Sequence, residues 1–231
     1  MTTPSSITTA PARFLLLGDS HAGAIGQAAK AANLPFQGGP IGSARDFNAE
    51  FFDLNGDDPV FREPAADRLY REFLIGLGIT GLAELTVPLV LTFGLSAHFF
   101  ATTENWQFYR SRDGRFRPGF ETSRLCERIV RAMARDALAF YRHARGLGLR
   151  VLAVLPPQRV PGMSDPVIFR IAQQAMLGAL TELDIELVDL RPQVTDPAGD
   201  QLPQFCQRDD PIHGNLAFGR LVVADLLARG L

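Results

Sequence analysis

Two short segments near opposite ends of the chain carry the residues best suited to nucleophilic catalysis. Gly18-Asp19-Ser20-His21 follows an apolar run, and Asp210-Pro211-Ile212-His213 lies close to the C-terminus. A serine hydroxyl becomes an effective nucleophile when a histidine removes its proton and a carboxylate orients that histidine. An aspartate three residues before a histidine, on a loop that contains proline, can supply the last two parts. Ser20, His213 and Asp210 are therefore our candidate nucleophile, base and orienting residue.

A parallel sheet covered by helices would bring these two distant segments together. Short apolar runs alternate with longer helical patterns along the chain, which is typical of α/β proteins. The sequence predicts a three-layer αβα sandwich whose parallel sheet has five strands, at residues 13–17, 34–37, 87–93, 150–155 and 185–190. Ligands of such sheets bind beyond the carboxyl ends of the strands, and Ser20 lies at such an end.

Three helices follow from hydrophobic periodicity and capping residues. Apolar side chains recur every three to four residues after Thr122 or Ser123, either of which can cap a helix, and this pattern ends at a glycine at position 146 or 148. Residues 167–183 form a second helical pattern. A last helix is predicted to begin near Asn215.

One segment is predicted to lie outside the main sheet. In Asn105–Phe116, the aromatic residues Trp106, Phe108 and Tyr109 lead into Asp113-Gly114. Aspartate followed by glycine is a strong signal for a two-residue turn. We therefore expect this segment to form a β-hairpin.

The two catalytic segments together resemble the motifs of the SGNH, or GDSL-type, hydrolase superfamily. Gly18-Asp19-Ser20 follows an apolar strand, Asp210-x-x-His213 precedes the C-terminal helix, and the element order agrees over the whole chain. The resemblance implies a flavodoxin-like fold and ester hydrolysis by Ser20, His213 and Asp210, without a metal or an organic cofactor. It also implies an oxyanion hole with backbone donors at Ser20 and at Gly42, for which Gly39 is the alternative.

The third block of the oxyanion hole departs from the family pattern. After Phe93 the family has Gly-x-Asn-Asp, whereas this chain has Gly94-Leu95-Ser96-Ala97-His98. Ser96 would stand in place of the asparagine as the third donor, with a shorter and freer side chain. Removing one such donor typically lowers the rate by about 10² to 10³. His98 is a second candidate for this role or for substrate binding, and it is equally compatible with a histidine packed at a strand end.

Four more residues adjoin these blocks and are candidates for substrate binding. Asp19 and His21 flank Ser20, while Gln158 and Arg159 follow the fourth strand after two prolines. Because the carboxyl ends of parallel strands meet at one edge of the sheet, all four are expected at the rim of the same site.

Composition excludes several other classes of protein. A chain of 231 residues with 46% hydrophobic residues can form one domain with a single core. A net charge of -2 gives no field for binding nucleic acid or an anionic membrane. Gly18, Gly23 and Gly26 lack the spacing of a dinucleotide-binding motif. We expect one hydrolase-like domain over residues 13–231.

The remaining sequence features point to a cytoplasmic protein. Cys126 and Cys206 lie far apart and lack the spacing of a zinc site or a disulfide framework. Residues 1–12 lack the basic start and apolar run of a signal peptide, so we expect a flexible leader. The apolar segment Phe73–Phe100 carries Glu84 and is broken by Gly76, Gly78, Gly81 and Pro88, so we expect buried core and not a transmembrane segment.

Three functions remain open at this point. The first is a serine esterase that acts on short acyl or acetyl esters, on small molecules or on carbohydrate. The second is an acyltransferase that passes the acyl group to a glycan, because the Gly-Asp-Ser-His variant resembles the SGNH modules of O-acyltransferase proteins. The third is a catalytically weak accessory domain that binds a glycan or another ligand. The substrate and the oligomeric state do not follow from the sequence.

Overall fold

The central sheet of the protein has five parallel strands in the order β2-β1-β5-β6-β7. The structure is a computed structural model and describes residues 11–48 and 50–231, so most of the predicted leader lies outside the described residues. The strands are β1 Leu15–Gly18, β2 Gln37–Pro40, β5 Leu89–Leu91, β6 Val151–Val154 and β7 Glu186–Val188. Both the five-stranded parallel sheet and its flavodoxin-like order are confirmed.

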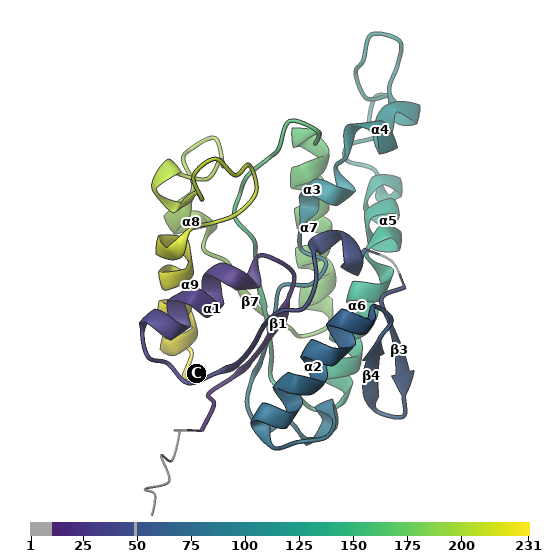
Figure 1. Cartoon of the computed structure of the whole chain (residues 1–231). Helices are drawn as coiled ribbons and strands as arrows, with labels where there is room; N and C mark the ends of the chain where they lie inside the picture. The colour runs from purple at the N-terminus through teal and green to yellow at the C-terminus, as the bar shows by residue number, and fades with distance from the viewer. Residues whose placement is uncertain (1–10, 49) are drawn as a thin grey trace, which may run out of the picture.

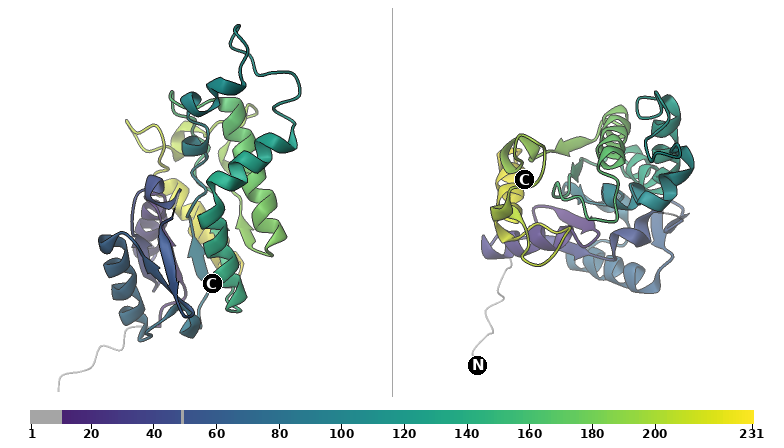
Figure 2. Two further views of the ribbon diagram at one scale, coloured as in Figure 1. Left: turned by 90° about the vertical axis from the view of Figure 1, so that its right-hand side faces the viewer. Right: turned by 90° about the horizontal axis from the view of Figure 1, so that it is seen from above.

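Helices cover both faces of this sheet and form the outer two layers (Figures 1 and 2). Side chains alternate along β1, so that Leu15 and Leu17 enter one core cluster and Phe14 and Leu16 enter the other. Helices α1 and α9 pack on the second cluster, and α2, α5, α6 and α7 contribute to the first. The helices are α1 Ala22–Ala31, α2 Pro64–Leu77, α3 Ala97–Phe100, α4 Thr103–Trp106, α5 Arg124–Met133, α6 Arg135–Gly146, α7 Pro166–Glu182, α8 Arg191–Val194 and α9 Leu216–Ala228.

Strand β2 lies three residues later than predicted because glycine, and not apolar side chains, defines it. Gly38 pairs with Leu16 of β1 and has φ of 109°, which favours glycine. A Cβ atom at this position would lie 1.9 Å from the Leu16 carbonyl oxygen. The strand predicted at residues 34–37 therefore overlaps β2 only at Gln37.

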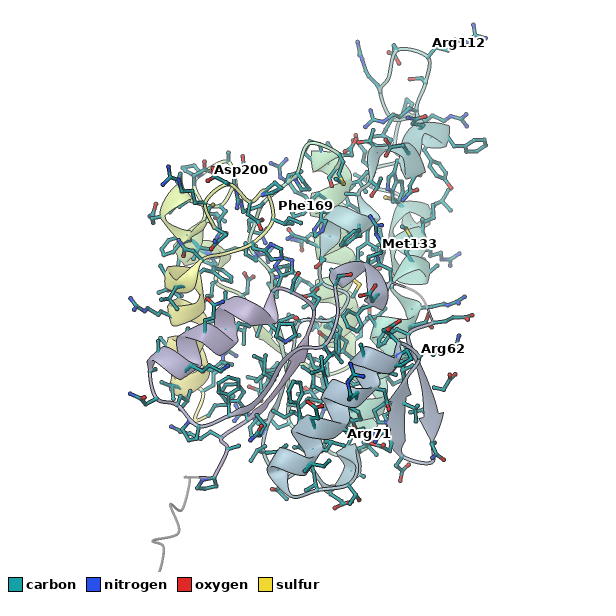
Figure 3. All side chains as sticks on the ribbon, in the orientation of Figure 1. Arg62, Arg71, Arg112, Met133, Phe169 and Asp200 are labelled. Carbon is teal, nitrogen blue, oxygen red and sulfur yellow. The ribbon has the colours of Figure 1, made fainter. Side chains whose placement is uncertain are left out.

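The predicted hairpin at Asn105–Phe116 is wrong in its first half. Residues Thr103–Trp106 form α4, and Gln107–Tyr109 form the 3₁₀ helix η3. Trp106 is buried and its Nε1 donates to the Phe100 carbonyl at 2.6 Å, which anchors a helical turn where a strand was expected. Only the isolated bridge between Arg110 and Phe116 remains of the hairpin, and the loop that it closes projects from the molecule with Arg112 at its tip (Figure 3).

The long helix predicted after Thr122 or Ser123 is interrupted. Ser123 caps α5 by accepting the Cys126 N–H at 3.2 Å, but Ala134 leaves helical geometry and separates α5 from α6. In the first segment Cys126 and Val130 are buried, whereas Leu125 is 52% exposed. The helices predicted at 167–183 and near Asn215 are confirmed as α7 and α9, capped by Asp165 and Asn215.

The sequence analysis did not place the antiparallel pair β3 Phe52–Asn55 and β4 Asp58–Phe61. The remaining 3₁₀ segments are η1 Ala44–Phe47, η2 Leu82–Glu84 and η4 Pro203–Phe205. Across residues 11–48 and 50–231, none of the helices has the length and apolar character needed to cross a membrane. The segment Phe73–Phe100 contributes α2 and β5 to the core, as expected.

Candidate active site

Ser20, His213 and Asp210 come together at the carboxyl edge of the sheet. Ser20 lies two residues beyond the end of β1, just before α1, and His213 lies in the loop before α9. Ser20 Oγ is 2.7 Å from His213 Nε2, and His213 Nδ1 is 2.7 Å from Asp210 Oδ2. The packing of α1 beside α9 brings together residues that are 193 positions apart in the chain (Figure 1).

Asp210 holds the His213 ring in one tautomer. Its Oδ1 accepts the backbone N–H groups of Ile212 at 2.7 Å and His213 at 2.8 Å. Partial burial opposes ionisation of the carboxyl, but these two N–H groups and the His213 ring lower the pKa of Asp210 to about 2. An ionised carboxylate only accepts hydrogen bonds, so Nδ1 of His213 carries the proton and Nε2 is free to accept the Ser20 proton.

The loop that carries His213 is anchored on both sides. The His213 carbonyl accepts the Gln207 N–H at 2.9 Å and Arg159 Nη1 at 3.2 Å. After the loop, the Asn215 side chain caps α9 by accepting the N–H groups of Ala217 and Phe218. These contacts hold the loop, and with it the His213 ring, in the position that proton transfer requires.

Gly42 lies on the same edge of the sheet as Ser20. Gly18 of β1 is in register with Pro40 of β2, so Ser20 and Gly42 each lie two residues beyond paired strand ends. Among the described residues, neither the Ser20 N–H nor the Gly42 N–H has a hydrogen-bond acceptor. Both groups are therefore available as donors, whereas the alternative, Gly39, lies within β2.

The structure corrects the roles predicted for Asp19 and Ser96. Asp19 is fully buried, and its carboxylate accepts the His21 N–H at 3.0 Å, Thr92 Oγ1 at 2.9 Å and Ser96 Oγ at 2.9 Å. Asp19 therefore cannot contact substrate, and the single hydroxyl hydrogen of Ser96 is used within the protein. This network joins the turn after β1 to the turn after β5 and so positions Ser20. The sequence signal that we missed is Thr92, a polar residue directly after the apolar strand β5.

Ser96→Ala tests this correction. Because the hydroxyl stabilises Asp19, we expect kcat to fall less than tenfold and not by the ~10² to 10³ typical of a lost oxyanion donor. We also expect the free energy of unfolding to fall by about 1 to 2 kcal/mol, since a buried carboxylate loses one donor. Ester hydrolysis and urea unfolding of the same samples would measure both effects. A hundredfold loss of kcat at unchanged stability would restore Ser96 as a donor.

Two buried histidines lie beside the triad. The His21 ring centroid is 5.0 Å from that of His213 and 6.3 Å from that of His98. Burial lowers the pKa of His21, and burial together with the neighbouring His21 and His213 rings lowers the pKa of His98 to about 4. Both rings are therefore neutral at pH 7. Each has one buried nitrogen, Nδ1 of His21 and Nε2 of His98, without a partner among the described residues.

His98 makes the stability of the protein depend on pH. Between pH 6.5 and pH 4 the unfolded chain binds a proton at this histidine and the folded chain does not, so acidification destabilises the fold by up to about 3 kcal/mol. We expect His98→Leu to lose less stability than the wild type between pH 7 and pH 4.5 in urea unfolding. Equal losses in the two proteins would show that His98 is not held neutral by its burial.

A hollow of about 370 Å³ opens at Ser20. It is lined by Ser20, His21, Gln27, Pro157, His213 and Phe218, among others. Gln158 and Arg159 lie beyond its wall and line an adjoining hollow. Among the described residues, no three His, Cys, Asp or Glu side chains are arranged to hold a metal ion. The hollow joins the polar groups of Ser20, Asp210 and His213 to a few apolar walls, a combination typical of small-molecule sites.

Comparisons with known proteins support the fold. No protein-family model matches the chain, and no curated protein matches it. A Streptococcus pneumonia protein provisionally assigned as a platelet activating factor matches with a TM-score of 0.50 at 12% identity, over 96% of this chain and 86% of that one. A provisionally assigned SGNH hydrolase from Slackia heliotrinireducens matches with a TM-score of 0.49 at 14% identity, over 95% and 98%.

A GDSL-like lipase from Bacteroides thetaiotaomicron matches with a TM-score of 0.45 at 15% identity, over 94% of this chain and 86% of that one. Proteins described as GDSL or SGNH hydrolases recur among the matches. At 12% identity, the likeness to the Streptococcus pneumonia protein shows the fold alone. The activity has to be argued from the site.

Proposed function

We propose that the protein is a serine esterase that hydrolyses carboxylic esters of short acyl groups. The observation that carries the proposal is the continuous chain of hydrogen bonds from Ser20 through His213 to Asp210, with 2.7 Å at each side-chain step. This arrangement supplies a nucleophile, a base and an orienting carboxylate in the geometry that acyl transfer requires. The hollow of about 370 Å³ at Ser20 supports a short acyl group.

In the proposed mechanism, Ser20 Oγ attacks the ester carbonyl carbon while His213 Nε2 takes the hydroxyl proton. The carbonyl oxygen becomes an oxyanion that accepts hydrogen bonds from the N–H groups of Ser20 and Gly42. His213 then gives its proton to the leaving alcohol, and an acyl-enzyme forms on Ser20. Water, deprotonated by His213, attacks the acyl carbon, and the carboxylic acid leaves as Ser20 regains its proton. Asp210 stabilises the charged ring in each step.

The test is release of p-nitrophenol from acetyl, butyryl and octanoyl esters at neutral pH. We expect wild-type turnover that is fastest for the shorter esters and is lost in Ser20→Ala. Ser111→Ala is the matched control, because Ser111 lies in the projecting loop and its substitution should leave turnover unchanged. Equal rates for wild type and Ser20→Ala would contradict the proposal and favour an accessory protein that only binds its ligand.

Acyl transfer to a glycan would use the same acyl-enzyme, with a sugar hydroxyl in place of water. A hollow of about 700 Å³ behind the His213 loop favours this second candidate, since it has room for an acceptor. Addition of a sugar acceptor to the ester assay separates the two functions. A transferase forms the acylated sugar in preference to free acid, whereas the esterase that we propose forms free acid at the same rate with and without the sugar.

A further inference from the structure

Arg45 follows Gly42 closely in the chain but takes no part in the proposed mechanism. It belongs to the 3₁₀ helix η1, which begins two residues after Gly42. Its guanidinium carbon lies 5.8 Å from the centroid of the Phe99 ring, and Phe99 belongs to α3, shortly after β5. This contact therefore joins the segment that follows β2 to the segment that follows β5.

The order of the strands places this contact across the end of β1. In the sheet β1 lies between β2 and β5, so the turn with Ser20 lies between the segments with Arg45 and Phe99. The neighbour of Phe99, His98, continues the wall toward Ser20, because its ring centroid is 4.2 Å from that of Phe99 and 6.3 Å from that of His21. The Arg45–Phe99 pair is therefore part of the rim around Ser20.

This part of the rim lies on the other side of Ser20 from His213. Phe47 of η1 and Phe100 of α3 belong to the first core cluster, whereas α9, which follows His213, packs on the second cluster, on the opposite face of the sheet. An ester whose carbonyl carbon lies at Ser20 therefore has the His213 loop on one side and Arg45 on the other. A substituent that points away from His213 extends toward the Arg45 guanidinium.

Arg45 is an exposed cation without an acidic partner. Among the described residues, no carboxylate oxygen lies within 4.0 Å of its guanidinium nitrogens. The adjacent carboxylate, Asp46, instead accepts the Ser43 N–H at 2.7 Å and the Ser43 hydroxyl at 2.9 Å. A guanidinium that lies over an aromatic ring keeps the N–H groups at its edge free, and these bind a carboxylate by paired hydrogen bonds.

We propose that Arg45 binds a carboxylate carried by the ester substrate, so that the enzyme selects anionic esters over neutral ones. The inference rests on the proposed esterase function, because the carboxylate belongs to a substrate of Ser20. Arg45 contacts the substrate away from the reacting carbonyl, so it determines specificity and takes no part in proton transfer. The carboxylate can belong to the acyl part or to the alcohol part of the ester, and the experiment separates these two cases.

The experiment compares two pairs of esters whose members differ only by a carboxylate in place of a methyl group. Monoethyl succinate and ethyl butyrate carry this difference in the acyl part, and 4-acetoxybenzoate and 4-methylphenyl acetate carry it in the alcohol part. For each pair we measure the ratio of kcat/KM for the anionic ester to kcat/KM for the neutral ester. We expect Arg45→Gln to lower this ratio about tenfold or more in one pair, which identifies the part that carries the carboxylate.

Two further variants and a change of salt concentration separate recognition of charge from a structural effect. Arg45→Lys keeps the charge but loses the paired hydrogen bonds, so part of the preference should remain. In about 1 M NaCl the wild-type ratio should fall, because salt screens exposed charges. Arg142→Gln is the matched control and should keep the wild-type ratio. Arg142 is also exposed and is also without a carboxylate within 4.0 Å among the described residues, but it lies in the half of α6 that leads to the amino end of β6.

Binding to Ser20→Ala protein gives a readout that needs no turnover. In NMR titrations we expect one of the anionic esters to bind about tenfold more tightly than its neutral partner, and Arg45→Gln in the same background should remove the difference. Equal kcat/KM ratios for the wild type and Arg45→Gln in both pairs would overturn the proposal and leave the esterase in place. If the wild type hydrolyses no ester, the esterase is refuted, and equal binding of the two members of each pair would then overturn this inference as well.

Discussion

Asp210→Asn is expected to lower kcat by about 10⁴-fold, the loss seen when the carboxylate of a Ser-His-Asp triad becomes an amide. The asparagine oxygen can still accept the N–H groups of Ile212 and His213, so the loop keeps its shape. Its amide nitrogen would replace Oδ2, which now faces His213 Nδ1 at 2.7 Å. A donor at this position forces the ring into the other tautomer, with the proton on Nε2. The ring can then no longer accept the Ser20 proton.

The neighbouring residue provides a matched control for this prediction. Asp209 undergoes the same change of charge and shape in Asp209→Asn, but its side chain is 91% exposed. Its backbone has φ of 56°, a conformation that asparagine adopts readily. We expect Asp209→Asn to keep wild-type kcat in the p-nitrophenyl acetate assay. Similar rates for Asp210→Asn and the wild type would mean that Asp210 plays no part in the reaction.

Gly219→Ala is expected to destabilise the protein by about 3 kcal/mol or more, the upper range for overpacking in a core. Gly219 lies in α9 where that helix meets α1, and a Cβ atom would lie 2.1 Å from the Ala24 carbonyl oxygen. Backbone cannot move aside as a flexible side chain can, so α1 and α9 must separate. Since these helices follow Ser20 and His213, activity should fall too. Thermal unfolding should show a melting temperature lower by roughly 6 to 12 °C.

A glycine-to-alanine substitution in another helix should instead raise the stability of the protein. Gly178 lies within α7, and the nearest atom to its added Cβ would be Arg131 Nη2 at 3.6 Å, an ordinary contact. Gly178→Ala should therefore stabilise the protein by about 0.5 to 1 kcal/mol, because alanine loses less entropy in a helix. If both variants melted at the wild-type temperature, the close contact between α1 and α9 would not exist in solution.

The sheet could be predicted from the sequence where strands are apolar and could not where they are made of glycine. Val151–Val154 is an apolar run buried between helix layers, so its position and length were close to the prediction. β2 contains Gln37-Gly38-Gly39-Pro40, and its place depends on close contact with the β1 backbone, which no local pattern reveals. The bend at Ala134 and the inward turn of Trp106 likewise depend on tertiary packing.

The candidate site shows the same division between local and long-range information. Asp210 and His213 are three residues apart, so their pairing follows from the sequence, and the fold brings Ser20 to them as the parallel sheet predicts. The role of Ser96 could not be read in this way. Its position in the chain alone predicted an oxyanion donor. In the structure the Ser96 hydroxyl instead donates to the carboxylate of Asp19, which is buried and needs hydrogen-bond donors.

Covalent labelling of Ser20 tests the central claim most directly. A fluorophosphonate reacts with a serine hydroxyl only where a base activates it and an oxyanion hole stabilises the product, so no substrate has to be known. We predict that intact-mass analysis of the wild type shows one adduct, that peptide mapping places it on Ser20, and that Ser20→Ala remains unlabelled. Urea-unfolded wild type should also remain unlabelled, because the fold brings His213 to Ser20. A folded wild type without an adduct, or equal labelling of Ser20→Ala, would contradict the account.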